Sequence, residues 1–484
     1  MIQQLQPIDK ISLTLILILS LVIGIMVVGD KTCGNNCWFK TSAKVEKFTW
    51  ENQEISATDT SFILSFNRPM ERASVEENLI IEPPLPGKIS WAGRKLAYTL
   101  ETPAPYGETY QIKLEGAKEN FANGNFIEPF VGKFNSRDRA FAYIGNQGEE
   151  QGKLILYNLT RQTKTILTPS NLVVMDFKFY PDGKSILFSA ANNNKPTEIY
   201  QNLQLYKINT GVNSTIIQPP ELILDNQDYQ NNQFDISSDG KTIVVQRINR
   251  KNTNDFDLWI IKSDQPPQPL NTQGGDFLIA PDGQTLAVAQ GEGIALLPLK
   301  TGAQPLDFLP KFGRVLNFSR DGTAAAMVNF NTDNAELRYT QSLFYVNNLG
   351  PQKELLNIKG SIIDCQFNPT STHLYCLVTK LMETEEYLVE QPYFIEINLK
   401  TGTAIPLLAL PNYQDIQISM APDGLGILFD QVITSNTPDT DNPLTTNSGQ
   451  NIVGGNLWLL IPVPTSQPQL EELPFVGFRP QWLP

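Results

Sequence analysis

The side chains that most often carry acid–base or metal chemistry are scarce in this sequence, because its 484 residues include a single histidine, His373. One histidine cannot supply a histidine-rich metal site, and any Ser-His-Asp triad would depend on this residue alone. We interpret His373 as a surface turn residue. The sequence contains no Gly-x-Ser-x-Gly elbow and no Walker-type or dinucleotide loop, which argues against elbow-type hydrolases and those nucleotide-binding enzymes.

Carboxylates, by contrast, are plentiful. Fifty Asp and Glu against 37 Lys and Arg give a net charge of −13, which argues against nucleic acid as a partner. A glycosidase needs only two carboxylates, so a carboxylate-based glycan-processing enzyme stays open, although no catalytic pair stands out. The Asp-Gly pairs lack the D-x-D-x-D spacing of a calcium loop. We therefore expect no catalytic residues, no metal and no cofactor.

Those Asp-Gly pairs belong to an internal repeat. Each follows an apolar residue and precedes a second apolar run, and Pro, Asp and Gly in this order favour a tight turn between two strands. The repeat occurs at residues 179–183 (FYPDG), 236–240 (ISSDG), 279–283 (IAPDG), 318–322 (FSRDG) and 420–424 (MAPDG), with a degenerate copy at 367–371 (FNPTS).

The apolar residue seven positions after the start of each copy is also regular, as in Phe179/Ile186 and Met420/Ile427. This constant offset predicts one hairpin register used six times. A second apolar strand follows each hairpin, and about 50 residues per repeat with four strands is typical of a β-propeller blade. The turns resemble those of TolB-like and other WD-type propellers over residues 136–484, a resemblance that implies the fold and leaves function open.

The ends of this region predict how the ring closes. Residues 139–144 (RAFAYI) look like a second strand without its first, and residues 478–484 (FRPQWLP) look like a first strand without its second. The C-terminus would then supply the innermost strand of the first blade, with Trp482 equivalent to Phe179. We favour seven blades; six is the alternative, with residues 136–168 outside the ring.

Polar residues recur six positions before each turn Asp, where the innermost strand begins. The occupants are Asp176, Gln233, Asp276, Val315, Asp364, Gln417 and Arg479. Such a ring at the channel mouth could bind a cation, water or a peptide, and the competing interpretation is that strand starts are simply polar and capped. The loops between the second and third strands are long and varied, which makes that face the expected recognition surface.

Four cysteines form two separated pairs. Cys365 and Cys376 flank the degenerate turn and are predicted to lie directly opposite each other, within disulfide range. We favour this bond over two buried thiols. Cys33 and Cys37 could form a local disulfide, and two further ligands for zinc are absent nearby.

The N-terminal part predicts export. Residues 11–29 include an uncharged run of 18 residues that we interpret as a single-pass transmembrane signal anchor after an N-terminal tail, residues 1–10; a cleaved signal peptide is the alternative. The lysines after this run make the charge rule ambiguous, but the cysteines favour an extracytoplasmic bulk. Residues 30–47 are predicted as a linker.

Residues 48–135 alternate apolar and polar positions, as at Phe62, Leu64 and Phe66, which predicts an antiparallel β-sandwich. Residues 65–70 (SFNRPM) and 79–83 (LIIEP), followed by Ser90-Trp91 and residues 106–110 (YGETY), resemble the bacterial Ig-like domain of the SbsA type. That resemblance implies a spacer or adhesion module on a cell-surface protein, without a general catalytic site.

These elements predict an all-β, membrane-anchored envelope protein that displays a propeller. We expect a non-catalytic role in protein–protein interaction or complex assembly, with an envelope protein as partner and no nucleic acid. Attachment to cell-wall glycan is the alternative. Stacking on sugars needs exposed aromatic rings, whereas Trp259 and Trp458 lie in predicted strands and are expected in the core.

Overall fold

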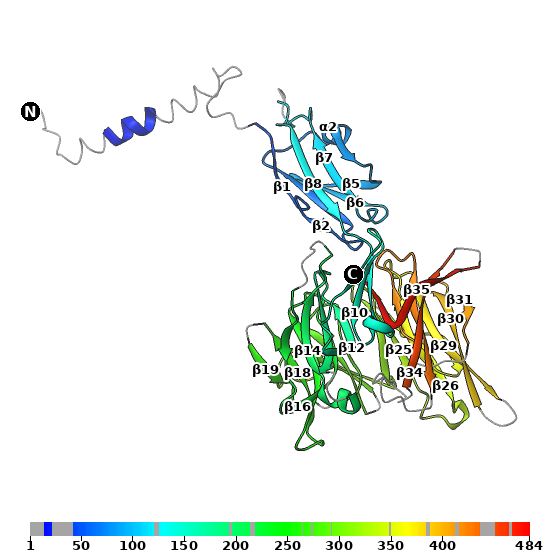
Figure 1. Ribbon diagram of the computed structural model, residues 1–484. Coiled ribbons are helices and arrows are strands. Elements are labelled where there is room, and N and C mark those ends of the chain that lie inside the picture. Colours follow the sequence, from blue (N-terminus) through cyan, green and yellow to red (C-terminus); the bar gives the residue numbers. More distant parts are fainter. Residues whose placement is uncertain are drawn as a thin grey trace, which may run out of the picture. The chain divides into compact units, whose positions relative to one another are not determined.

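The computed structural model shows an all-β protein with few helical turns (Figure 1). It describes residues 14–21, 42–120, 125–192, 196–212, 218–263, 265–272, 274–291, 293–347, 350–383, 388–411, 416–435, 451–463 and 467–484. Cys33, Cys37 and most of the predicted anchor at 11–29 lie outside these ranges, and residues 14–21 are helical. No helix in the described ranges is long and apolar enough to cross a membrane.

The chain divides into two compact units. The first comprises Met1–Gln53, Ser61–Thr102 and Thr109–Phe134, and the second comprises Glu54–Thr60, Pro103–Glu108 and Asn135–Pro484. Strand β1 begins at Val45 and pairs with β3, so the predicted linker 30–47 extends too far. The predicted single boundary at 135/136 also differs from the structure, in which residues 54–60 and 103–108 belong to the second unit. A pattern read along the chain cannot show that such short segments group with residues far away in sequence.

Two four-stranded sheets build the N-terminal part, in the orders β1-β3-β6-β5 and β2-β8-β7-β4. Period-two alternation turns one face of β3 inward, and Phe62, Phe66 and Leu64 are fully buried. Aromatic rings fill the core: Trp50 lies 5.1 Å from Phe134. The elements are β1 (Val45–Phe48), β2 (Glu54–Ile55), β3 (Ser61–Phe66), α2 (Arg72–Asn78), β4 (Leu79–Glu82), β5 (Gly87–Ala92), β6 (Lys95–Leu100), β7 (Thr109–Leu114) and β8 (Phe130–Ser136).

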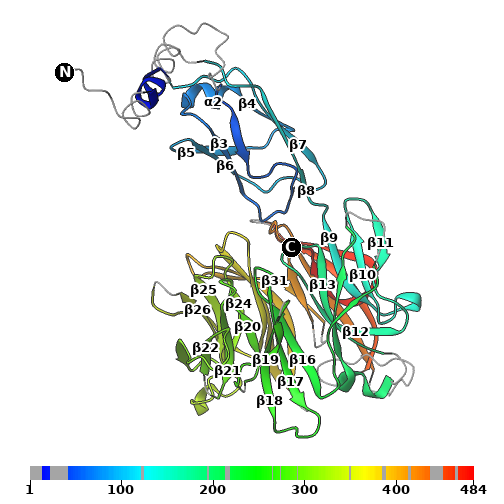
Figure 2. The same ribbon diagram turned by 90° about the vertical axis from the view of Figure 1, so that its left-hand side faces the viewer.

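The second unit is a β-propeller. In its described residues, five antiparallel four-stranded sheets follow one another in sequence order (Figures 1 and 2). They are β12 (Leu172–Phe179), β13 (Ser185–Asn192), β14 (Gln204–Asn209) and β15 (Glu221–Leu224); β16 (Tyr229–Ile236), β17 (Thr242–Asn249), β18 (Phe256–Lys262) and β19 (Gln265–Pro269); β20 (Phe277–Ile279), β21 (Thr285–Gln290), β22 (Gly293–Pro298) and β23 (Asp307–Pro310); β24 (Arg314–Phe318), β25 (Ala324–Asn329), β26 (Thr340–Asn347) and β27 (Lys353–Lys359); β28 (Ile362–Phe367), β29 (His373–Glu383), β30 (Leu388–Asn398) and β31 (Ala404–Ala409). Short 3-10 turns lie at Gly148–Glu150, Pro196–Asn202 and Ala335–Leu337.

The repeated hairpins have one register. In each, the first apolar residue pairs with the residue seven positions later, from Phe179↔Ile186 to Met420↔Ile427. The turn needs a left-handed residue, which is Gly183 (φ 65°) in the first copy and Ser371 (φ 52°) in the degenerate one. The sequence therefore predicts this local geometry correctly, down to the pairing of individual residues.

The remaining strands form one seven-stranded sheet, ordered β11-β10-β9-β35-β34-β33-β32. The long C-terminal strand pairs with β34 through its first part and with β9 through its last part, where Phe478 faces Ile144 and Trp482 faces Phe141. This is the pairing that the chain ends predict. The strands are β9 (Ala140–Gly145), β10 (Leu154–Asn158), β11 (Thr163–Ile166), β32 (Ile418–Met420), β33 (Ile427–Ser435), β34 (Asn451–Ile461) and β35 (Gln469–Trp482).

Candidate functional site

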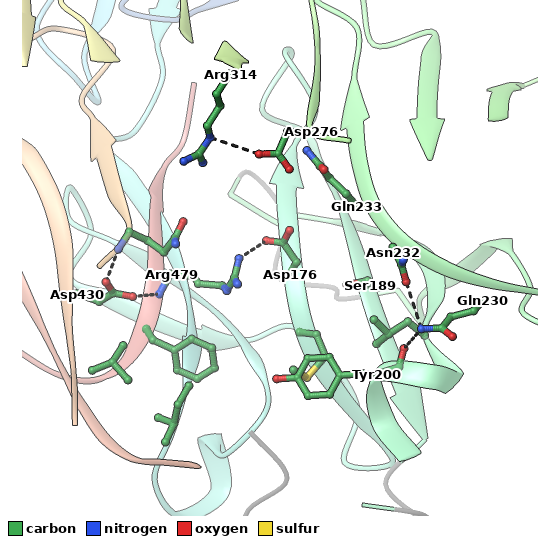
Figure 3. Close-up of a pocket in the computed structure, with 16 residues that line it drawn as sticks. Asp176, Ser189, Tyr200, Gln230, Asn232, Gln233, Asp276, Arg314, Asp430 and Arg479 are labelled. Atoms are coloured by element: carbon green, nitrogen blue, oxygen red, sulfur yellow. Dashed lines mark hydrogen bonds and ion pairs between the residues drawn. The ribbon is translucent and has the colours of Figure 1, made fainter. Parts of the chain in front are cut away.

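A cavity of about 530 Å³ opens where the innermost strands of the propeller begin (Figure 3). It lies at the end of the blades where the second strands connect to the third, since Tyr200 and Leu203 come from such a connection and Val432 and Ile452 flank another. Its remaining lining residues are Met175, Asp176, Ser189, Gln230, Asn232, Gln233, Asp276, Arg314, Gln417, Asp430, Phe478 and Arg479.

Five of the six polar residues predicted at the channel mouth line this cavity: Asp176, Gln233, Asp276, Gln417 and Arg479. Asp364 does not. Its carboxylate turns back on its own strand, where it accepts hydrogen bonds from the Cys365 N–H (2.8 Å) and the Gln366 side chain (3.4 Å). Burial raises the pKa of Asp364 to about 6, and these hydrogen bonds and the nearby Arg314 oppose that shift.

Arg479 connects three parts of the ring (Figure 3). Its guanidinium lies 3.2 Å from Asp176 Oδ1, and its backbone N–H donates to Asp430 Oδ2 at 2.7 Å. Its φ of 53° lies in the left-handed region, at a register shift between Phe478 and Gln481. Such a conformation is costly for arginine, so the contacts around it must hold it in place.

Asp430 is the site residue that the sequence analysis missed. It is fully buried on β33, and its carboxylate also accepts the Gln417 N–H at 2.7 Å. Burial raises its pKa to about 6, and the two backbone hydrogen bonds oppose that shift. The signal was present, because Asp430 is the residue that the hairpin register places opposite Gln417.

A second ion pair lies across the cavity. Arg314 Nε is 3.4 Å from Asp276 Oδ2, and the same guanidinium donates to the Ile363 carbonyl at 3.2 Å. Arg314 lies next to Val315, the apolar member of the predicted ring, so the polar contribution of this blade comes one residue earlier than the alignment predicts. The cavity thus contains two Asp–Arg pairs and a buried carboxylate bonded to backbone.

Within the described ranges, hydrogen bonds and ion pairs link the innermost strands of neighbouring blades. Many of these contacts use a second row of polar residues, each two positions after a residue of the predicted row. Side chains two apart on a strand face the same side of the sheet, so the sequence could have indicated this second row as well. The contacts are Lys178–Asp235 (2.6 Å), Ile279 N–Asp235 (2.8 Å), Arg314–Asp276 (3.4 Å), Arg314–Ile363 O (3.2 Å), Gln366–Ile418 O (2.8 Å), Trp482 N–Ser419 Oγ (3.0 Å) and Gln481–Phe177 O (2.8 Å). They support the interpretation of this polarity as structural at much of the ring.

Amides and apolar groups complete the lining. The Gln230 amide donates to Asn232 (3.3 Å) and to the Tyr200 carbonyl (3.4 Å), and Gln233 donates to the Phe277 carbonyl (3.2 Å). Met175, Leu203 and Phe478 are buried side chains of the adjoining core, so one wall of the cavity is apolar. No feature of the sequence singled out Tyr200, because its position depends on how one irregular connection folds.

The other candidate chemical residues lie outside the cavity. Cys365 and Cys376 face each other across β28 and β29 and are disulfide-bonded, the pairing that their numbering predicts. His373 begins β29, and its ring lies 3.0 Å from the Thr372 hydroxyl and 3.2 Å from the Asn398 amide. Within the described ranges, no group of three or more His, Cys, Asp or Glu side chains is arranged to hold a metal ion.

No family model and no curated protein matches this chain. Solved structures that resemble it include an oligogalacturonate lyase of Vibrio parahaemolyticus (TM-score 0.44, 11% identity, 60% of this chain and 87% of that one). TolB of Acinetobacter baumannii (0.40, 10%, 84% and 83%) and a puromycin hydrolase (0.40, 12%, 69% and 58%) also resemble it. At these scores and identities, the neighbours do not discriminate between binding proteins and enzymes.

Proposed function

We propose that this chain is a non-catalytic envelope protein whose propeller binds another protein. In this proposal residues 11–29 anchor the chain in a bacterial membrane with the bulk outside the cytoplasm, and an SbsA-type Ig-like domain at 48–135 acts as a spacer. A seven-bladed propeller closed by the C-terminal strand presents the binding face. The apolar run at 11–29, the ring of inner-strand contacts and the Cys365–Cys376 disulfide support these parts.

The observation that carries the proposal is that exposed apolar side chains lie at two of the connections between second and third strands. Phe330 and Tyr339 bound one such connection, and Ile433 and Val453 lie on a hairpin that extends from another. Because strands alternate in direction, all four lie at the same end of the blades as the cavity. Exposed apolar side chains grouped on one face are typical of protein-binding surfaces.

Each carboxylate that lines the cavity already forms an ion pair or accepts backbone hydrogen bonds, which supports a binding role over a catalytic one. Asp176 pairs with Arg479, Asp276 pairs with Arg314, and Asp430 accepts two backbone N–H groups. A glycosidase needs a protonated acid and a second carboxylate that both face the bond being broken. These pairings do not provide that arrangement.

The test is photo-crosslinking in intact host cells with the full-length chain. A photoreactive residue at position 330 is expected to give adducts with one envelope protein, identified by mass spectrometry. Tyr339→Glu and Ile433→Glu should abolish the adducts, because a charge would have to be buried at the interface. Leu425→Glu is the matched control, since Leu425 is apolar and 63% exposed but lies in a turn at the opposite end of a blade. Adducts that persist in both variants, or no protein adduct, would contradict the proposal.

A further inference from the structure

The central cavity differs in chemistry from the four exposed apolar side chains at the same end of the blades, Phe330, Tyr339, Ile433 and Val453, which we call the apolar rim. Its polar side chains come from several blades and place acceptors next to donors: Asp176 beside Arg479, Asp276 beside Arg314, and Gln230 beside Asn232. Figure 3 shows these groups around one space. A ligand that fits them must offer donors and acceptors close together, as adjacent hydroxyl groups do.

The charges of the cavity are close to balance. Two guanidinium groups each lie against a carboxylate, at 3.2 and 3.4 Å, and the third carboxylate, on Asp430, is held by backbone N–H groups. An anionic ligand would need an unpaired cation, and a cationic ligand would need an unpaired carboxylate. This arrangement therefore favours a ligand without net charge.

One wall of the cavity is apolar and includes an aromatic ring. Tyr200 is 41% exposed and lines the cavity (Figure 3), as do the apolar side chains of Met175 and Leu203. A pyranose ring presents C–H groups on one face and hydroxyls around its edge, so it can pack on a tyrosine while its hydroxyls bond to planar polar groups. A volume of about 530 Å³ lies within the range of about 300–1,000 Å³ that small-molecule sites occupy.

We propose that this cavity binds a short segment of an uncharged saccharide, with Tyr200 as the stacking platform and the Asp–Arg pairs and amides as hydrogen-bond partners. This site is distinct from the protein-binding rim and does not depend on it. An extended peptide fits less well, because it would pair with a free strand edge. Carbonyls of the innermost strands already accept hydrogen bonds from neighbouring blades, as Phe177, Phe277 and Ile418 do.

The test uses the full-length protein in a polyoxyethylene detergent, because glycoside detergents would compete. An array of neutral and acidic oligosaccharides is screened first, and the neutral tetrasaccharide with the strongest signal is then titrated calorimetrically. Saturable binding is expected. Tyr200→Ala and Gln230→Ala should each weaken binding about tenfold, the effect of losing one stacking or polar contact.

Tyr339→Ala is the matched control, because it removes a tyrosine that is also exposed (53%, against 41% for Tyr200) but does not line the cavity. It should leave sugar affinity unchanged while weakening the protein adducts at the rim, so the two proposals can fail separately. Retention of acidic sugars only, no retention of neutral sugars, or equal affinity in all variants would overturn the proposal. So would a peptide library that binds through Tyr200 and Gln230.

Discussion

A single buried carboxylate organises the backbone where the C-terminal strand enters the ring. Asp430 receives the N–H groups of Arg479 and Gln417, and neither contact requires it to be exposed to a ligand. Arg479 is thereby held at positive φ, the conformation in which its guanidinium reaches Asp176. Asp430 therefore influences the cavity through the main chain that it holds in place.

The pH dependence of stability tests this account of Asp430. Burial raises its folded-state pKa from 3.8 to about 6, so the folded protein holds this proton more tightly than the unfolded chain. The stabilisation from that proton is complete below pH 3.8 and is lost as the pH rises through 6.

Asp430→Asn removes this titration and also places an amide NH₂ against a backbone N–H. We expect a loss of about 1–3 kcal/mol in unfolding free energy, from one unsatisfied buried group. Because only the wild type gains the contribution of Asp430 on acidification, whereas Asp364 titrates in both proteins, the gap between the two should be wider at about pH 5 than at about pH 7.5. Denaturant unfolding at both pH values measures it, and a gap that widens with rising pH would falsify the account.

At the scale of the element, the hairpins differ in what fixes their turns. Five hairpins end in Asp-Gly, whereas the β28–β29 hairpin has Ser371 in the left-handed position and carries the disulfide between Cys365 and Cys376. Both cysteines are fully buried in a hydrophobic cluster. The disulfide therefore constrains this hairpin, as the Asp-Gly turn residues constrain the other five.

Cys365→Ala with Cys376→Ala is therefore expected to destabilise the propeller by about 2–4 kcal/mol, since the unfolded chain regains its freedom. Thermal unfolding of the oxidised wild type and the double variant measures the loss. Adding reductant to the variant is the control and should change nothing further. An unchanged unfolding midpoint in the double variant would show that packing alone holds this hairpin.

Hairpins were the part of this fold that could be read from the sequence. The turn at Asp182-Gly183 and the pairing of Phe179 with Ile186, seven residues later, depend only on nearby sequence. The pattern of one repeat therefore predicts the hairpin of the next. The polar row at Gln233 and Gln417 could be predicted for the same reason. The same register places Asp430 opposite Gln417, but its bond to the Arg479 N–H could not be predicted, because that contact joins strands that are distant in sequence. Tyr200 could not be predicted either, because its place in the cavity depends on an irregular connection.

At the scale of the whole molecule, the last strand holds the propeller together. Gln481 donates to Phe177 in the first complete blade, the Trp482 N–H donates to Ser419 in the last, and Trp482 lies 5.8 Å from Phe141 on β9. Arg139 stacks on Trp482 at 4.8 Å. Removing the Trp482 side chain should therefore weaken the second unit, because its ring belongs to a buried cluster with Phe141 on β9, Leu428 on β33 and Leu457 on β34.

Trp482→Ala is expected to cost about 3–5 kcal/mol, as for other buried aromatic residues, and to lower the calorimetric transition of the second unit. Trp50→Ala is the matched control: Trp50 is as buried as Trp482 but packs on Phe62 and Phe134 in the first unit. Each variant should move one transition and spare the other, and deletion of residues 478–484 should exceed Trp482→Ala in the same transition. If both substitutions shifted a single common transition, the two units would unfold together, and the last strand would stabilise the whole chain rather than the propeller alone.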